Sequence, residues 1–270
     1  MKTPDSRFYC PLITVGTIIL DENESSHAVR VCRAANGDTL QLCDGLGHYA
    51  DATITKADAK ACEVRVDTVE NAPFKRPRLK LAIACLKDDA LEEVVFHVAQ
   101  TETDSIVFLR TDYSQEPKNS DLHKLVRRSE LKSLVSLKQS KKAWMTRIEG
   151  PIEFDKWLND YQGDLILCDI DGERNLKLDE RAAENAKNEM RTDNSPTDNA
   201  QADNAQAGNA QAGNAQAKPI TLLVGPEGGF SPREINAVKS FENGKVYLLN
   251  LGNTRLRART AAVVALGKIL

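Results

Sequence analysis

Two patterns of hydrophobic and polar positions divide the chain. In the first part, DTLQLCDG (38–45) and ACEVRVDTVE (61–70) alternate apolar with polar side chains at a period of two, and Asn36-Gly37-Asp38 supplies a turn. Such alternation is typical of half-buried strands. We therefore predict a small, mostly antiparallel barrel over residues 1–72, with one helical turn around ESSHAVRVCR (24–33).

From residue 79 the pattern changes to strands that alternate with helices. Apolar runs of strand length are LKLAIACL (79–86), SIVFLRT (105–111) and DLILCDI (164–170), and helical spacing appears in DALEEVVFHVAQ (89–100) and LHKLVRRSELKSLVSLKQ (122–139). This alternation predicts βαβ units and a mainly parallel sheet covered on both faces. Residues 79–270 are thus expected to form an α/β domain, joined to the first domain by a linker at 71–78 that contains two prolines.

A repeat interrupts the second domain. N-A-Q-A followed by Asp, Gly or Lys occurs four times from Asn199 to Lys218. Its period is too short and its side chains are too polar to stack into a core, so we predict a disordered low-complexity insertion at about 184–218. Because the entropy of loop closure grows slowly with length, such an insertion need not break the fold.

Composition excludes several classes of protein. The hydrophobic fraction of 41% and the formal net charge of -3 are ordinary, and no apolar run has the length that spans a bilayer. The start lacks the pattern of a secretory signal, so we expect a cytoplasmic protein with no membrane partner. The six cysteines and four histidines form no cluster, which predicts reduced thiols and no metal site.

Positive charge is concentrated in one segment. Between residues 124 and 147 the bases outnumber a single acid, Glu130. These bases are Lys124, Arg127, Arg128, Lys132, Lys138, Lys141, Lys142 and Arg147. The run is equally consistent with a solvated helix face and with a surface that binds nucleic-acid phosphates.

The stretch TLLVGPEGGFSPREI (221–235) combines a strand, a glycine loop and a helix start. Ser231 at the N-cap position, followed by Pro232 and Glu234, predicts a capping box that begins a helix. Ligands of parallel sheets bind outside the carboxyl ends of the strands, so the loop 225–230 is a candidate site. A purely structural turn is an equal alternative. The loop has neither the lysine of a phosphate-binding loop nor a dinucleotide fingerprint.

A second unit of the same kind follows. KVYLLNL (245–251) is strand-like, GNTRLRAR (252–259) is a loop that contains arginines, and TAAVVALGKIL (260–270) is a helix that is apolar nearly all round. Such a helix is buried, either against its own sheet or against another subunit. Two glycine-opened loops at neighbouring strand ends predict a slot for a flat, largely unphosphorylated ligand.

LLVGPEGGFSPREI and LNLGNTRLRARTAAVVAL together resemble the RsmE family of SPOUT-class methyltransferases, which use S-adenosylmethionine to methylate N3 of a uridine in 16S ribosomal RNA. HAVRVCRAANGDTLQLCDGLG (27–47) is similar to the PUA-like RNA-binding barrel of that family. The resemblance implies an N-terminal PUA-like β-barrel and a C-terminal SPOUT α/β methyltransferase domain with a trefoil knot. It also implies a homodimer and the small ribosomal subunit as partner.

The resemblance assigns roles to particular residues. Arg257 matches the second arginine of the family motif L-R-x-E-T and is expected to contact the base or its phosphate. Glu227 is expected to be a polar partner of cofactor or base, with a structural carboxylate as an equal alternative. The expected cofactor contacts are Val224, Gly225, Pro226, Glu227, Gly228, Gly229, Leu249, Leu251, Gly252, Leu256 and Arg257. The expected RNA contacts are Arg30, Arg33, Arg127, Arg128, Lys138, Lys141 and Lys142.

Several positions depart from the family pattern. Asn253 and Thr254 replace the usual proline and arginine, and Arg259 stands where a glutamate is expected. Three interpretations therefore stay open: an active uridine-N3 methyltransferase, a catalytically degenerate SPOUT-fold RNA-binding or ribosome-assembly protein, and an enzyme that methylates another position or transfer RNA.

Overall fold

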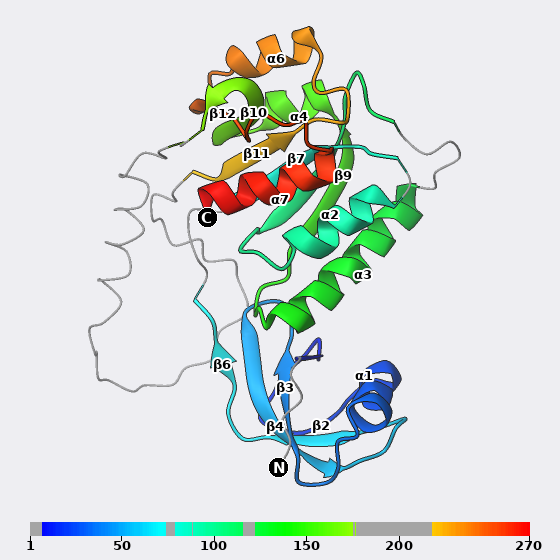
Figure 1. Ribbon diagram of the computed structural model, residues 1–270. Helices are drawn as coiled ribbons and strands as arrows, with labels where there is room; N and C mark the ends of the chain where they lie inside the picture. Colours follow the sequence, from blue (N-terminus) through cyan, green and yellow to red (C-terminus); the bar gives the residue numbers. More distant parts are fainter. Residues whose placement is uncertain (1–6, 74–78, 88, 116–121, 175, 177–217) are drawn as a thin grey trace, which may run out of the picture.

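The computed structural model describes residues 7–73, 79–87, 89–115, 122–174, 176 and 218–270, and it contains two sheets (Figure 1). The N-terminal sheet has the strand order β1-β3-β4-β5-β2, with β6 paired to β4. Its strands are β1 (Phe8–Tyr9), β2 (Gly16–Ile19), β3 (Thr39–Cys43), β4 (His48–Lys56), β5 (Glu63–Val66) and β6 (Glu70–Asn71). All pairs are antiparallel except β1 with β3, as the period-two alternation predicts.

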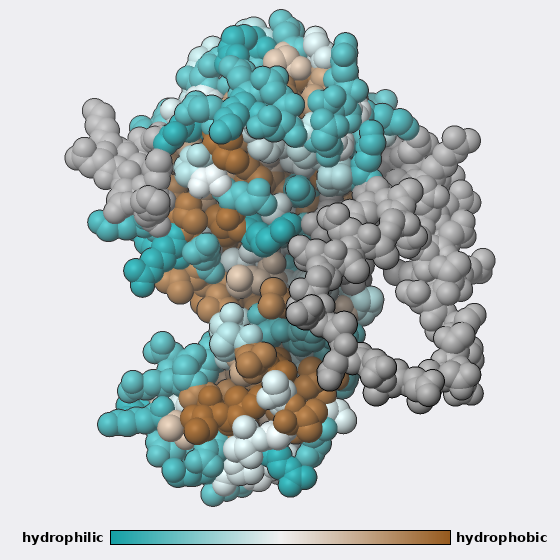
Figure 2. All heavy atoms as spheres, turned by 180° about the vertical axis from the view of Figure 1, so that it is seen from behind, coloured by the Kyte–Doolittle hydropathy of each residue, from teal (hydrophilic) through white to brown (hydrophobic). Residues whose placement is uncertain are grey.

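The predicted helical turn of the N-terminal part is also present. It consists of α1 (Glu22–Ser26) and a π-helix, η1 (His27–Val31). Figure 2 shows that apolar residues gather on one face of this part of the molecule. The large hydrophobic residues of the N-terminal part that are exposed are Leu12, Val15, Ile19, Val31 and Leu46.

The second sheet is parallel throughout and has the order β12-β10-β11-β7-β8-β9. Its strands are β7 (Leu79–Ala84), β8 (Ser105–Arg110), β9 (Arg147–Glu153), β10 (Asp164–Glu173), β11 (Ile220–Val224) and β12 (Val246–Leu249). Its helices are α2 (Ala90–Val98), α3 (Leu122–Ser140), α4 (Phe154–Asp160), α6 (Pro232–Lys239) and α7 (Ala258–Ile269). The predicted parallel sheet is confirmed. Sequence analysis missed β9 and α4, because RIEGPIE lacks a continuous apolar run.

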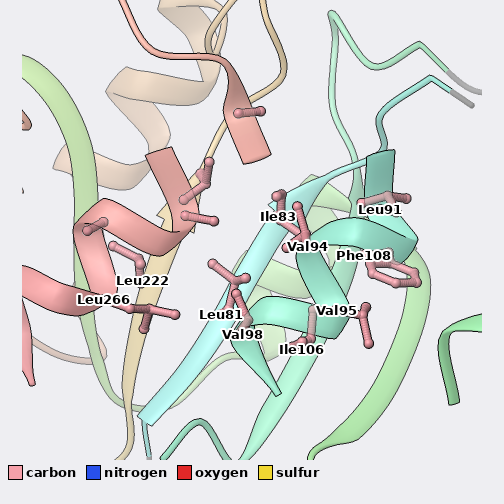
Figure 3. Packing of buried hydrophobic residues seen from close by; sticks show 14 of the residues in the cluster. Leu81, Ile83, Leu91, Val94, Val95, Val98, Ile106, Phe108, Leu222 and Leu266 are labelled. Carbon is pink, nitrogen blue, oxygen red and sulfur yellow. The ribbon is translucent and has the colours of Figure 1, made fainter. Parts of the chain in front are cut away.

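Helices cover both faces of this sheet. On one face, Leu81 and Leu222 pack with Val94 of α2 and Leu266 of α7 (Figure 3). On the other face, Leu223 packs in a cluster that contains residues of α4 and α6. Successive side chains of a strand point to opposite faces, so a buried parallel strand such as β11 is apolar at every position.

The last helix packs against its own sheet. Ala258, Ala262, Ala265 and Leu266 of α7 are buried in the cluster on the α2 face. Val263, on the same helix, is 42% exposed. Sequence analysis gave two possible locations for this helix, its own sheet or another subunit, and one side of α7 is buried against its own sheet.

The two sheets meet at a turn of the N-terminal part. The Gly47 N–H donates to the Ala143 carbonyl (3.0 Å), and the Met145 N–H donates to the Gly45 carbonyl (2.9 Å). A Cβ at Gly47, whose φ is 104°, would lie 2.4 Å from the Trp144 ring, so glycine is required there.

No helix in the described ranges is long and apolar enough to cross a membrane. Residues 184–217 of the predicted insertion and residues 74–78 of the predicted linker lie outside the described part of the chain.

Candidate active site

Both glycine-opened loops border one cavity of about 500 Å³, where β10, β11 and β12 end. Eight of the predicted cofactor contacts line it: Val224, Gly225, Pro226, Gly229, Leu249, Leu251, Gly252 and Leu256. A third wall comes from Leu167, Cys168, Asp169 and Ile170 of β10. The remaining lining residues, which were not among the individually predicted cofactor contacts, are Phe230, Ile235, Asn250, Asn253, Thr254, Arg255, Ala258 and Ala261.

The first loop folds tightly on its own backbone. The Gly229 N–H donates to the Pro226 carbonyl (2.8 Å), and Gly229 has a φ of 75°. A Cβ at Gly225 would lie 3.0 Å from the Gly229 carbonyl carbon and from the Phe230 nitrogen. Gly225 is therefore required for this close approach, and Gly229 for the turn.

The predicted capping box fixes where this loop ends. The Ser231 hydroxyl accepts a hydrogen bond from the Glu234 N–H (3.2 Å), and the Glu234 carboxylate accepts one from the Ser231 N–H (2.9 Å). The buried Glu234 carboxylate also accepts from the Asp112 N–H (2.8 Å). The helix start is thus fastened to the loop that follows β8.

Asn250 organises the second loop. Its side-chain oxygen accepts a hydrogen bond from the Gly252 N–H (2.7 Å), and its own N–H donates to the Glu173 carbonyl (2.9 Å). Its side-chain amide also donates to the Ile170 carbonyl. Asn250 therefore joins the loop to the end of β10. An asparagine before a glycine is a turn signal in the sequence, but its partners on β10 are not.

Arg255 connects the two loops. Its guanidinium donates to the carbonyl of Glu227 (2.8 Å) and also lines the cavity. Glu227 and Gly228 are exposed at the tip of the first loop, and Arg257 is exposed at the N-cap of α7. Within the described part of the chain, none of these last three residues borders the cavity. The two predicted catalytic side chains therefore lie outside its walls.

The walls of the cavity are largely apolar. Among the described residues that line it, Asp169 and Arg255 are the charged ones. One oxygen of the Asp169 carboxylate accepts from the Asp171 N–H (3.1 Å), and the other lies 3.9 Å from Lys239 Nζ. Burial raises the pKa of Cys168 to about 12. At neutral pH that thiol is uncharged.

The departures from the family pattern occupy different places. Asn253 and Thr254 line the cavity. Arg259 instead forms an ion pair with Glu93 of α2 and is absent from the described lining. The reversed charge at position 259 is therefore directed to α2.

The bases predicted to contact RNA fall into two groups. Arg30, Arg33, Arg127 and Lys141 are exposed. Arg128 is also exposed, with its Nε 2.9 Å from a carboxylate oxygen of Glu92.

Two lysines of the basic segment are held inside the protein. Lys138 Nζ lies 2.6 Å from a carboxylate oxygen of the buried Glu24 and so joins α3 to α1. Lys142 Nζ donates to the carbonyls of Ala99 (3.0 Å) and Thr101 (2.6 Å) and to the hydroxyl of Thr146 (3.0 Å). Burial lowers the pKa of Lys142 to about 8.

In the described ranges, no group of three or more His, Cys, Asp or Glu side chains is arranged to hold a metal ion.

A parallel α/β sheet with one ligand-sized cavity between two glycine loops, preceded by a mostly antiparallel sheet, defines a two-part ligand-binding protein. Residues 74–270 match the family model of the RNA methyltransferase domain, and residues 20–67 match that of the RNA methyltransferase PUA domain. The chain therefore belongs to the RNA methyltransferase family. The resemblance drawn from the two glycine loops is confirmed.

The matches to known proteins cover almost the whole length of this chain. Ribosomal RNA small subunit methyltransferase E of Mycobacterium bovis is 27% identical over 259 residues, which cover 95% of this chain and 87% of the relative. A probable rRNA-methyltransferase from Porphyromonas gingivalis is 26% identical with a TM-score of 0.69, covering 98% of this chain and 96% of that one. Ribosomal RNA small subunit methyltransferase E from Neisseria gonorrhoeae, solved with S-adenosyl methionine bound, has the same fold at 19% identity, with a TM-score of 0.72 and coverage of 98% and 96%.

Proposed function

We propose that this protein transfers a methyl group from S-adenosylmethionine to N3 of a uridine in 16S ribosomal RNA of the small ribosomal subunit. The observation that carries the proposal is that both family-like glycine loops wall one cavity. Its volume of about 500 Å³ lies in the range of small-molecule sites. Membership of the RNA methyltransferase family and the names of the relatives give the reaction class.

The residues of the cavity fit this cofactor. Apolar walls suit the adenine ring, and tight glycine turns leave main-chain N–H and C=O groups close to a ligand. The Asp169 carboxylate is the acidic member of the described lining and suits the positive charge of the cofactor. Among the described residues that line the cavity, Arg255 is the single basic side chain, so the lining has no cluster of bases that would bind a phosphate. This agrees with an unphosphorylated ligand.

When bound, the sulfonium group of the cofactor supplies an electrophilic methyl. The residues of this chain then have to orient the base and stabilise charge on it. Arg257 and Glu227 are exposed near the ends of two loops that Arg255 connects, and we assign them to the mouth of the cavity. There Arg257 stabilises the negative charge that develops on the uracil carbonyl oxygens as the N3 proton passes to water, and Glu227 is a polar partner of the entering base.

The finer description of the fold belongs to the same proposal. We assign residues 1–72 to a PUA-like β-barrel and residues 79–270 to a SPOUT domain with a trefoil knot, with the low-complexity insertion at about 184–218. The knot is supported by the path of the chain after β12, because β12 is an edge strand whereas α7 packs on α2 and on the more central β11.

The RNA-binding surface is assigned to the exposed bases. These are Arg30, Arg33, Arg127, Arg128 and Lys141. Lys138 and Lys142 are left out of the surface, because their ammonium groups are bound by Glu24 and by main-chain carbonyls. A homodimer and a cytoplasmic location, which the family resemblance implies, belong to the same proposal, and the exposed Val263 of α7 is available to a second subunit.

The test is methyl transfer from tritiated S-adenosylmethionine to small ribosomal subunits that lack the modification. We expect label in N3-methyluridine of the 16S RNA. Gly225→Val is expected to abolish both cofactor binding and transfer, because even a Cβ there lies 3.0 Å from main-chain atoms. Gly267→Ala is the control, because a Cβ there would meet no atom within 4 Å apart from its chain neighbours and the backbone of its own helix.

Calorimetry with the cofactor separates the two alternatives. Cofactor binding without label in any RNA, or no cofactor binding with salt-dependent RNA binding, contradicts the proposal and favours the catalytically degenerate RNA-binding protein. Label at another nucleoside or in transfer RNA favours the third interpretation.

A further inference from the structure

An exposed tyrosine lies against the tip of the first glycine loop. Tyr113 is 48% exposed. Its Cβ and Cδ2 would lie 3.5 Å from a Cβ at Gly228. Pro226 and Gly229, on either side of that tip, line the cofactor cavity. The phenol ring is therefore separated from the cavity by one turn of backbone.

Neither the hydrophobic clusters nor a side-chain hydrogen bond accounts for the position of this ring. Tyr113 is not a member of any hydrophobic cluster in the described part of the chain. Its hydroxyl makes no hydrogen bond to the residues that the structure describes. Aromatic side chains are enriched at interaction surfaces, and an exposed ring offers a face on which a nucleic-acid base can stack.

The residue before Tyr113 is fixed by ionic hydrogen bonds. The Asp112 carboxylate accepts from Arg233 Nη2 (2.9 Å) and Nε (3.2 Å) and also from the Ser231 hydroxyl. The third guanidinium nitrogen of Arg233, Nη1, donates to both oxygens of Asp155 (2.7 and 2.8 Å). The Asp112 N–H is bound by the Glu234 carboxylate described above.

The residue after Tyr113 closes a small turn. The Ser114 hydroxyl accepts from the Thr111 N–H (2.9 Å), and the Ser114 N–H donates to the Thr111 carbonyl (3.0 Å). Both neighbours of Tyr113 are thus held to the rest of the protein. A ring on such a turn loses little conformational entropy when a ligand packs on it.

On the basis of the proposed function, we infer that Tyr113 is a stacking platform for an unpaired base that flanks the target uridine. Methylation at N3 requires that the uridine leave its stack, which exposes the flanking bases. Tyr113 lies beside the cavity and outside it, where a base next to the uridine passes. Stacking of a base on an aromatic side chain contributes about 1 to 3 kcal/mol and tolerates any base. The platform therefore adds affinity for the RNA and contributes nothing to cofactor binding.

The experiment compares Tyr113→Ala with Tyr113→Phe and Tyr113→Trp in the methyl-transfer assay on small subunits that lack the modification. We expect Tyr113→Ala to raise KM for the RNA by roughly 5-fold to 150-fold, as the stacking energy implies. Its kcat and its Kd for S-adenosylmethionine are expected to stay within about twofold of the wild type, because stacking acts equally on bound substrate and transition state. The two aromatic variants are expected to keep the wild-type KM. Leu131→Ala, which removes an exposed apolar side chain from α3, is the matched control.

Other outcomes overturn the inference. An unchanged KM in Tyr113→Ala shows that no base stacks on the ring, and a changed sedimentation coefficient shows that the ring binds a protein subunit. If the wild type transfers no methyl group to any RNA, the proposed function fails by itself. In that case, filter binding of transcribed 16S RNA still tests the platform: equal affinity of Tyr113→Ala and wild type contradicts it, and weaker binding that Tyr113→Phe restores supports it.

Discussion

Because of Lys142, the free energy of unfolding of the protein is expected to increase in alkaline solution. Its ammonium is surrounded by the Ala99 and Thr101 carbonyls and the Thr146 hydroxyl, and burial lowers its pKa from 10.5 to about 8. Glu102 and Asp104 raise that pKa and offset part of the effect. The folded state therefore releases the proton of Lys142 at a lower pH than the unfolded state does.

The sign and size of the effect follow from proton linkage. Between the two pKa values the unfolded chain binds more protons, so the free energy of unfolding rises with pH. The difference of about 2.5 pKa units, at about 1.4 kcal/mol per unit, gives roughly 3 kcal/mol in all. About 2 to 3 kcal/mol of this gain is expected between pH 7 and pH 10, because most of the interval between the folded and unfolded pKa values of Lys142 lies in that range.

Urea unfolding of the wild type and of Lys142→Met at pH 7 and pH 10 measures this term. Subtracting the variant from the wild type removes the contribution of other titrating groups, and the difference is expected to grow by about 2 to 3 kcal/mol at the higher pH. Lys132→Met, at an exposed position of α3, is the control and should show no such growth. A pH-independent difference for Lys142 would refute the reasoning. RNA affinity should keep its salt dependence in Lys142→Met, since no phosphate contact is lost.

Two further predictions concern the loops. Arg255→Ala removes the hydrogen bond to the Glu227 carbonyl that connects the two loops. Calorimetry is expected to show roughly 5-fold to 10-fold weaker cofactor binding, equivalent to about 1 kcal/mol. Unchanged binding would show that the loops keep their positions without this hydrogen bond. Ser231→Ala removes the helix cap at Glu234 and is expected to lower stability by about 1 kcal/mol, which shifts Tm by about 2 to 4 °C. A melting curve identical to the wild type would contradict the role of the cap.

The parts of the site that follow from local sequence were predictable. Ser231 and Glu234 have the three-residue spacing of a capping box, and the reciprocal hydrogen bonds are present. The glycines of the first loop were a less specific signal. Gly228, at the tip of the loop, is exposed, and a Cβ there would meet only ordinary contacts. The position where a side chain does not fit is Gly225, whose Cβ would lie 3.0 Å from main-chain atoms of the same loop. The sequence alone does not show which glycine of a loop faces the loop's own backbone.

The parts of the site that depend on distant pairing were not predictable. The third wall at Cys168 comes from β10, whose carboxyl end reaches the cavity because β10 lies between β11 and β12. In the sequence, Lys138 and Lys142 look like members of a basic helix face. The partner of Lys138, Glu24, lies 114 residues away along the chain. The partners of Lys142, Ala99 and Thr101, lie 43 and 41 residues away. A count of charges along a helix does not distinguish an ammonium that faces solvent from one that faces carbonyls.

The positions that depart from the family pattern do not weigh equally against catalysis. The ion pair of Arg259 with Glu93 directs the reversed charge to α2, and both side chains are well exposed, so this pair changes the field in the cavity little. Asn253 and Thr254 line the cavity and act directly on whatever occupies it. The resemblance leads one to expect an arginine at position 254, and here the neighbouring Arg255 donates to the Glu227 carbonyl of the first loop. Arg255 therefore connects the two loops that border the cavity. Arg259→Glu is therefore expected to change the rate of methyl transfer less than Asn253→Pro or Thr254→Arg does.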